Sequence, residues 1–175
     1  MTLAISIIGG AAVLAAALAL FFWQRQKRAV WTRYRKAAQR IIREEYLDAS
    51  IGKTEYGAAR PVPRKLMVAL EIKGARGKGY VFDPEREIRI GRSLESSDLC
   101  LPDTMVSSQH SRIFLWEGQV CIQDMDSANG TVVQQGLGLR RTLWGQAETL
   151  GDKARIQVGN TDIRIRIFSC EVSGR

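Results

Sequence analysis

Residues Val106–Val133 read VSSQHSRIFLWEGQVCIQDMDSANGTVV, and this stretch gives the clearest indication of the fold class. Short runs of strand-forming residues alternate in it with clusters of Ser, Asn, Asp and Gly, which are typical of turns. The same texture extends outward in both directions, with a strand-like run every roughly eight to twelve residues. No segment after Leu66 shows sustained helical periodicity. The pattern predicts an all-β sandwich or barrel for the C-terminal part of the chain.

The run IRIRIF near the C-terminus shows the alternation most clearly. Successive side chains of a strand point to opposite faces of the sheet. We therefore expect Ile163, Ile165 and Ile167 to share one face, with Arg164 and Arg166 on the other.

The N-terminal part has a different character. Leu3–Trp23 is apolar and contains no charged side chain, and as a helix it would span about 30 Å, the thickness of a hydrocarbon core. This predicts a transmembrane helix over residues 1–23. A cleaved signal peptide is the alternative, but such peptides carry a basic residue before a shorter apolar run. Basic residues instead follow the run: Arg25, Lys27, Arg28, Arg33, Arg35, Lys36, Arg40 and Arg43.

This basic flank predicts the orientation of the chain. Lys and Arg are enriched on the cytoplasmic side of membrane spans, so we expect a single-pass protein with its N-terminus outside and its C-terminal domain in the cytoplasm. The same residues, within 25–43, are expected to contact anionic lipid. Membrane lipid, through residues 3–23 and this flank, is therefore one predicted partner.

Two segments connect the predicted span to the β-rich part. Residues 24–48 predict a basic juxtamembrane helix with one apolar stripe, either lying on the membrane or extending the span. Residues 49–64 read ASIGKTEYGAARPVPR, and their Gly and Pro predict a flexible linker. Thr54 is a candidate phosphorylation site there. The GKT within the linker lacks the first glycine of a phosphate-binding loop, where Leu47 stands instead, so nucleotide binding is rejected.

Charge and cysteine content exclude other classes of protein. Of the net charge of +8, residues 24–63 carry +6, with 10 Lys and Arg against 4 Asp and Glu. Residues 64–175 carry only +2, with 16 against 14, so nucleic acid is not an expected partner of the domain. Cys100, Cys121 and Cys170 are odd in number and form no CxxC pair, which argues against a disulfide framework or a zinc site. The sequence predicts no metal and no cofactor.

The turns between the predicted strands carry the informative residues. GRS occupies 91–93, VSSQHS occupies 106–111 and DSANGT occupies 126–131. In this order and spacing, from about residue 66 to 168, the chain resembles the forkhead-associated (FHA) domain, a phosphothreonine-binding β-sandwich of about eleven strands. The resemblance implies an FHA domain over residues 65–170 with a C-terminal tail at 171–175.

The resemblance also implies a role for each matching residue. Arg92 matches the arginine that pairs with phosphate, Ser107 and Ser108 match residues that contact phosphate oxygens, and Asn129 matches the asparagine that holds the peptide backbone. The site-shaping positions are Gly91, His110, Ala128 and Gly130. His110 is expected to brace the loops, and Ala128 stands where many members carry Thr, which removes one contact.

The expected function is binding without catalysis. Its partners are phosphothreonine-containing proteins, which are substrates of a Ser/Thr kinase or the kinase itself. The resemblance to small bacterial membrane proteins implies a setting near cell-wall synthesis or division. The alternative is a structural membrane scaffold with an FHA-like fold that binds no phosphate. An enzyme is not expected, because no nucleophile elbow or metal cluster accompanies the single His.

Overall fold

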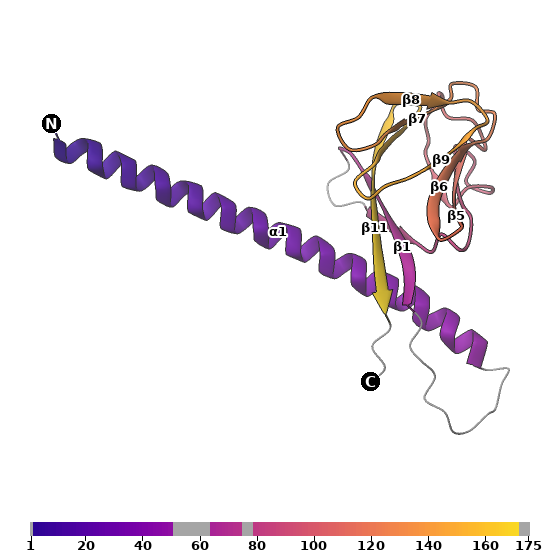
Figure 1. Cartoon of the computed structure of the whole chain (residues 1–175), viewed down its shortest axis with the longest axis horizontal. Helices are drawn as coiled ribbons and strands as arrows, with labels where there is room; N and C mark the ends of the chain where they lie inside the picture. Colours follow the sequence, from indigo (N-terminus) through magenta and orange to yellow (C-terminus); the bar gives the residue numbers. More distant parts are fainter. Residues whose placement is uncertain (1, 51–63, 75–78, 172–175) are drawn as a thin grey trace. The chain divides into compact units, whose positions relative to one another are not determined.

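The computed structural model describes residues 2–50, 64–74 and 79–171, and within the helix it describes the side chains of residues 14–45. The chain divides into two compact units, residues 1–36 and residues 37–175. The described residues form one helix, α1, and eleven strands, and Figure 1 shows how the strands gather into a β-rich part.

Helix α1 spans Thr2–Ser50 without a break. Residues 11–51 contain neither Gly nor Pro, so nothing local ends the helix where the sequence pattern changes at residue 23. The predicted span and the predicted juxtamembrane helix are therefore one continuous helix.

The continuity of the helix does not show that it crosses a membrane. Over the part of the chain that the structure describes, no helix has the length and hydropathy that crossing a bilayer requires. The span expected at residues 1–23 includes residues 1–13, whose side chains lie outside the described set, and it stays a prediction. Most of the expected linker, with Thr54, falls in residues 51–63, also outside the described residues.

Eleven strands follow, in agreement with the expected number. They are β1 (Arg64–Ile72), β2 (Gly79–Phe82), β3 (Ile88–Gly91), β4 (Leu99–Cys100), β5 (Ser111–Trp116), β6 (Gln119–Asp124), β7 (Thr131–Gln134), β8 (Arg140–Leu143), β9 (Ala147–Thr149), β10 (Arg155–Val158) and β11 (Thr161–Glu171).

The strands form two sheets. One has the order β2-β1-β11-β10-β7-β8 and the other the order β4-β3-β5-β6-β9. The long strands β1 and β11 lie side by side in Figure 1, with Arg64 opposite Glu171 and Ile72 opposite Ile163. Only β3 and β4 pair in parallel among the strand pairs of the described residues. Hairpins and meanders of this kind, with one apolar face per sheet, make a β-sandwich.

The main core lies between the two sheets and is built from alternating strand residues. Ile163 and Ile165 are buried in it and Ile167 packs against it, while Arg164 is exposed. The alternation predicted for IRIRIF is confirmed. Because the sheets are fully packed inside, the loops that join them at one end are presented by a rigid frame.

A second, smaller core joins the end of α1 to the first sheet within the unit formed by residues 37–175. Ala38 and Ile42 are buried there with Met67 of β1 and Cys170 of β11. The sequence predicted the apolar stripe of this helix but not its partner, which for these turns is the sheet.

Candidate functional site

The residues singled out from the sequence lie on three loops at one end of the sandwich, here called the loop end. The β3–β4 loop follows Gly91, the β4–β5 loop ends at His110, and the β6–β7 loop ends at Gly130. Segments far apart in the sequence therefore meet, and hydrogen bonds between the loops show how closely.

Gly91 and Arg92 bring the first loop against the second. The Arg92 N–H donates to the Ser107 carbonyl at 2.9 Å, and the Ser93 N–H donates to the Ser108 carbonyl at 3.3 Å. A side chain at Gly91 would collide with the Ser108 carbonyl oxygen and would lie 2.8 Å from Ser97 Oγ. Only glycine permits this approach of the two backbones.

The side chain of Arg92 is exposed and has no hydrogen-bond or ion-pair partner in the part of the chain that the structure describes. Asp98, an acid of the same loop, is taken by Arg89 at 3.1 Å. Burial alone would raise the pKa of Asp98, but hydrogen bonds from Arg89 outweigh it and lower that pKa. Arg92 thus offers an uncompensated guanidinium, which is suited to an anion.

His110 connects the second and third loops. It is fully buried, its Nδ1 accepts from the Ser107 N–H at 3.1 Å, and its Nε2 lies 3.1 Å from the Gly130 carbonyl. This pattern requires the tautomer with the proton on Nε2. Both ring nitrogens are engaged, so the only His of the chain is placed as a brace and not as an acid–base catalyst.

Ser107 and Asn129 add two more ties between these loops. Ser107 Oγ accepts from the Ala128 N–H at 3.1 Å, and Asn129 Nδ2 donates to the Met105 carbonyl at 2.8 Å. Since its oxygen accepts, the Ser107 hydroxyl keeps its hydrogen for a further acceptor. Ser108 is exposed beside it. The structure therefore brings together all eight residues predicted for the site.

Sequence reasoning missed the residue that organises the β6–β7 loop. Asp124 is buried, and it accepts hydrogen bonds from Ser127 Oγ and Thr131 Oγ1, each at 2.7 Å, from the Ser127 N–H at 3.0 Å and from the Gly145 N–H at 3.1 Å. Burial raises the pKa of Asp124, but these hydrogen bonds outweigh it, so the net effect lowers that pKa. The sequence signal for this network is an acid followed at three and seven positions by Ser127 and Thr131, on either side of the Asn-Gly turn.

Asp103 has a similar role in the β4–β5 loop, and it was also missed. Its carboxylate accepts from the Met105 N–H at 2.9 Å and from the Asn160 N–H at 2.8 Å. These two backbone hydrogen bonds lower the pKa of Asp103. The bond to Asn160 ties the site to the β10–β11 turn, which is fifty-seven positions away in the sequence.

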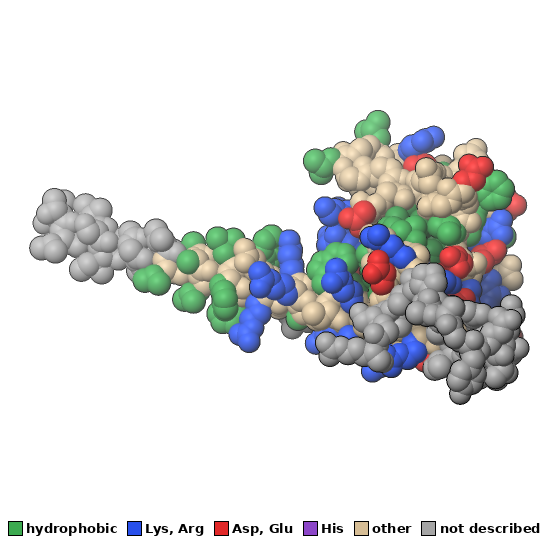
Figure 2. All heavy atoms as spheres, turned by 60° about the horizontal axis from the view of Figure 1, so that its bottom comes forward, with side chains coloured by type: hydrophobic (Ala, Val, Ile, Leu, Met, Phe, Trp, Pro, Cys, Tyr) green, Lys and Arg blue, Asp and Glu red, His purple; other side chains and the backbone are tan. Residues whose placement is uncertain are grey.

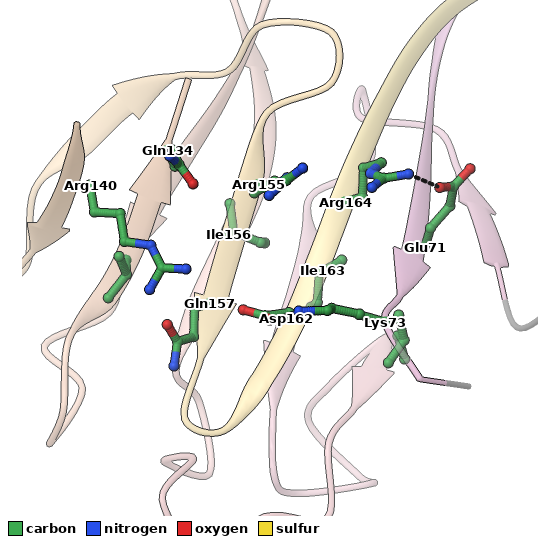
Figure 3. A pocket seen from close by; sticks show the side chains of 12 residues that line it. Glu71, Lys73, Gln134, Arg140, Arg155, Ile156, Gln157, Asp162, Ile163 and Arg164 are labelled. Carbon is green, nitrogen blue, oxygen red and sulfur yellow. Dashed lines mark hydrogen bonds and ion pairs between the residues drawn. The ribbon is translucent and has the colours of Figure 1, made fainter. Parts of the chain in front are cut away.

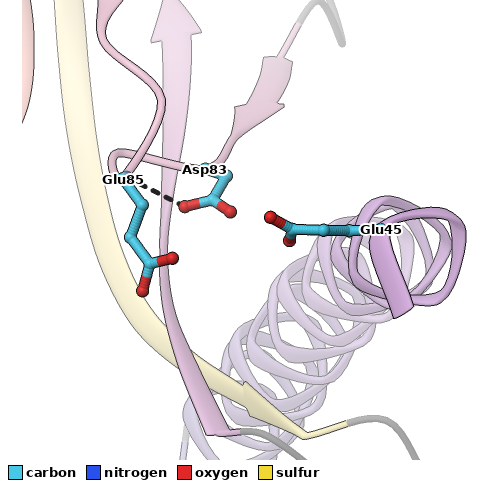
Figure 4. Close-up of side chains that lie close together, drawn as sticks. All are labelled: Glu45, Asp83 and Glu85. Carbon is cyan, nitrogen blue, oxygen red and sulfur yellow. Dashed lines mark hydrogen bonds between the residues drawn. The ribbon is translucent and has the colours of Figure 1, made fainter. Parts of the chain in front are cut away.

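One cluster of carboxylates lies elsewhere, where α1 meets the sheet. Figure 4 shows Glu45, Asp83 and Glu85 converging, with ligand oxygens within 4.8 Å of one another. The Lys65 Nζ lies between them, at 2.6, 3.0 and 2.8 Å respectively. Burial alone would lower the pKa of Lys65, but hydrogen bonds to the three acids outweigh it and raise that pKa. The cation that these carboxylates surround is an ammonium group, so they are not assigned to a metal.

Charge over the rest of the β-rich unit is mixed. Figure 2 shows acidic and basic side chains interspersed on its visible face, in keeping with the charge of +2 for residues 64–175. What the loop end can do chemically is bind a compact anion through Arg92 and neighbouring hydroxyls.

Comparison with known proteins identifies the domain. Residues 88–159 match the family model of the FHA domain, a stretch that contains all eight predicted site residues. The FHA domain of the CT664 protein from Chlamydia trachomatis superposes with a TM-score of 0.50 at 24% identity, over 58% of this chain and 98% of that one. The β-sandwich is thus FHA-like in its fold, and residues 88–159 of it match the FHA domain.

Two further matches are similar in kind. An FHA domain from a study of phosphothreonine-dependent FHA domain interactions is 28% identical with a TM-score of 0.49, over 58% of this chain and 97% of that chain. An FHA domain-containing protein of Arabidopsis thaliana is 35% identical over 63 residues. That match covers 35% of this chain and only 16% of the plant protein.

Proposed function

We propose that this protein is a membrane-anchored module that binds phosphothreonine peptides at the cytoplasmic face, within Ser/Thr-kinase signalling. The observation that carries the proposal is the exposed side chain of Arg92, which has no partner among the described residues, on a loop whose backbone is hydrogen-bonded to that of Ser107 and Ser108. FHA domains recognise phosphorylated motifs through arginine and neighbouring donors, which supports the assignment.

Each residue has a part in the proposed complex. Arg92 pairs with the phosphate, and the hydrogens of Ser107 and Ser108 are donated to phosphate oxygens. The Oδ1 of Asn129 accepts from the peptide backbone while its Nδ2 stays on Met105. Charge-assisted hydrogen bonds of this kind contribute about 1.5–3 kcal/mol each, so a peptide without the phosphate binds much more weakly.

Calorimetry on the full chain in detergent tests the binding step. The ligands are an oriented peptide library with a fixed phosphothreonine and the same library with Thr. We expect binding only by the first, and Arg92→Ala to weaken it by about 10- to 100-fold. The matched control is Arg86→Ala, another highly exposed arginine of the same unit. Equal binding of both libraries, or of neither, sinks the proposal and favours the scaffold alternative.

Membrane attachment is the second part of the proposal, and the sequence supports it. Leu3–Trp23 carries no charged side chain, and the basic residues 25–43 follow directly. Alkaline carbonate is expected to leave the full chain in the membrane pellet and to release a chain that lacks residues 1–23. Release of the full chain would rule out a membrane span, and it would leave the conclusion from the phosphopeptide measurement unchanged.

A further inference from the structure

The β7–β8 connection exposes two leucines. In the segment 135–139, here called the leucine loop, Leu137 is 103% exposed and Leu139 is 90% exposed. Single exposed apolar residues are common on proteins. Two highly exposed leucines on one loop indicate a binding surface, because exposing their apolar area to water is unfavourable unless another surface covers it.

The loop that carries these leucines is held in place by hydrogen bonds. Gln134 Nε2 donates to the Gly138 carbonyl at 2.9 Å, and the Gly138 N–H donates to the Gln135 carbonyl at 2.8 Å. Gln135 in turn bonds the Thr149 carbonyl at 2.6 Å and accepts from the Gly151 N–H at 3.1 Å. The leucines are therefore presented outward by a fixed backbone.

An arginine row lies next to the leucine loop, on the outer face of the six-stranded sheet. Arg140 of β8 pairs with Gln134 of β7, Gln134 pairs with Arg155 of β10, and Arg155 pairs with Arg164 of β11. Figure 3 shows these side chains in line along one face. They line a cavity of about 250 Å³.

The charge of this row is only partly compensated. Arg164 reaches Glu71 at 3.9 Å, and the neighbouring Lys73 is paired with Asp162 at 3.2 Å. Arg140 and Arg155 make no ion pair with any residue that the structure describes. Two unpaired guanidinium groups beside the leucine loop form a surface that is apolar at its tip and cationic at its base.

The position of this surface relative to the candidate site follows from β7. That strand begins at Thr131, directly after Gly130 of the loop end, and finishes at Gln134, directly before the leucine loop. The antiparallel partner β10 runs from Arg155 beside the leucine loop to Val158 beside the loop end. The leucine loop and the phosphothreonine loops therefore lie at opposite ends of the sandwich.

We propose that the leucine loop, with Arg140 and Arg155, docks on the surface of an anionic lipid bilayer. Leu137 and Leu139 enter the boundary between headgroups and acyl chains, and the two arginines contact lipid phosphates, which is how amphipathic surfaces bind membranes. An acidic protein segment would match the arginines alone and leave both leucines in water. In the docked state the phosphothreonine loops point away from the bilayer, toward soluble partners.

Hydrogen–deuterium exchange of the full chain tests this proposal. The chain is reconstituted in vesicles of phosphatidylcholine alone and in vesicles that also contain phosphatidylglycerol. Amides of residues 135–141 are expected to exchange at least about fivefold more slowly in the anionic vesicles. Leu137→Ser with Leu139→Ser, and separately Arg140→Glu with Arg155→Glu, should abolish the difference. The control is Leu94→Ser, an 80% exposed leucine of the β3–β4 loop, which should preserve it.

Three outcomes overturn the proposal. These are equal exchange in both vesicles, a difference that survives the paired leucine substitutions, and slowing by soluble polyglutamate but not by anionic vesicles. The last result would assign the surface to an acidic protein segment. Phosphopeptide affinity of the paired leucine variant and of the paired arginine variant should match wild type, so a failure of lipid docking is distinguishable from a failure of phosphopeptide binding.

Discussion

The loop end of the sandwich and the place where α1 packs on the sheet use charged residues in opposite ways. Where α1 packs, Lys65 is surrounded by three carboxylates, so its charge is neutralised within the protein. At the loop end Asp98, Asp103 and Asp124 accept hydrogen bonds from the domain's own donors, and Arg92 has no acidic partner among the residues that the structure describes.

The difference separates a charge that holds the fold from a charge that is available to a ligand. Removing one partner of a buried ion pair costs much stability, and the partly buried pair of Lys65 with the buried Asp83 comes close to that situation. An exposed arginine contributes little to stability when it has no partner. Arg92 is therefore the residue whose replacement should change binding most and the fold least.

The largest effect is expected at the loop end, from Asp124→Ala. Four donors lose their acceptor, and unsatisfied buried donors cost about 1–3 kcal/mol each, so we expect the free energy of unfolding to fall by about 4 kcal/mol. Urea unfolding followed by fluorescence measures it. Asp126→Asn, a change at an exposed neighbour, should alter stability little. A loss for Asp124→Ala no greater than that of the control would show that this network does not hold the loops.

The second-largest loss of stability is expected from His110→Ala, which removes the buried ring that connects the β4–β5 and β6–β7 loops. The buried ring and both of its bonds, to Ser107 and Gly130, are lost, and we expect a loss of about 3 kcal/mol in stability. Phosphopeptide affinity should also fall although Arg92 is unchanged. Calorimetry at a temperature where the variant is folded separates the two effects, and an unchanged affinity would mean that the brace is purely structural.

Ile42→Ala tests the other side of the comparison. The substitution opens a cavity in the small core between α1 and the sheet, for which we expect about 2 kcal/mol, near the lower end for buried Ile. Amides of the helix from Ala37 onward should exchange faster, while those of the β4–β5 loop and phosphopeptide affinity stay as in wild type. A change of affinity would show that the two regions are coupled.

The smallest effect expected is the pH dependence due to the acids at the loop end. The pKa of Asp124 is lowered in the folded protein, so its contribution is present above the unfolded value of about 3.9 and is lost as the pH falls through the folded value. Stability should decline below about pH 4, and less steeply in Asp124→Asn. Parallel declines in both proteins, measured by urea unfolding, would contradict the assignment.

Much of the domain could be predicted from the sequence because its signals are local. Alternation in IRIRIF requires only neighbouring residues, and the turn residues around Asn129-Gly130 mark a loop by themselves. The order of GRS, VSSQHS and DSANGT then placed Arg92, Ser107 and Asn129 in one site. The structure brings these loops together, and their role in binding remains to be tested.

Other features depended on partners distant in the sequence. Asp124 looks like an ordinary turn acid until Thr131 and Gly145 are seen to donate to it. The apolar stripe of α1 had no visible partner until Met67 and Cys170 covered it. In each case the missing information was a contact between elements, which periodicity and turn chemistry do not encode.

The class of fold, the order of the loops and the contrast between a basic N-terminal region and a nearly neutral domain all follow from the sequence. Which charges are neutralised follows from the fold. Asp98 pairs with Arg89 and not with Arg92, which has no partner among the described residues, while Glu45 of the packed helix pairs with Lys65. The physical reason is that pairing depends on distance in space, and that distance is set by the packing of the sheets and the helix.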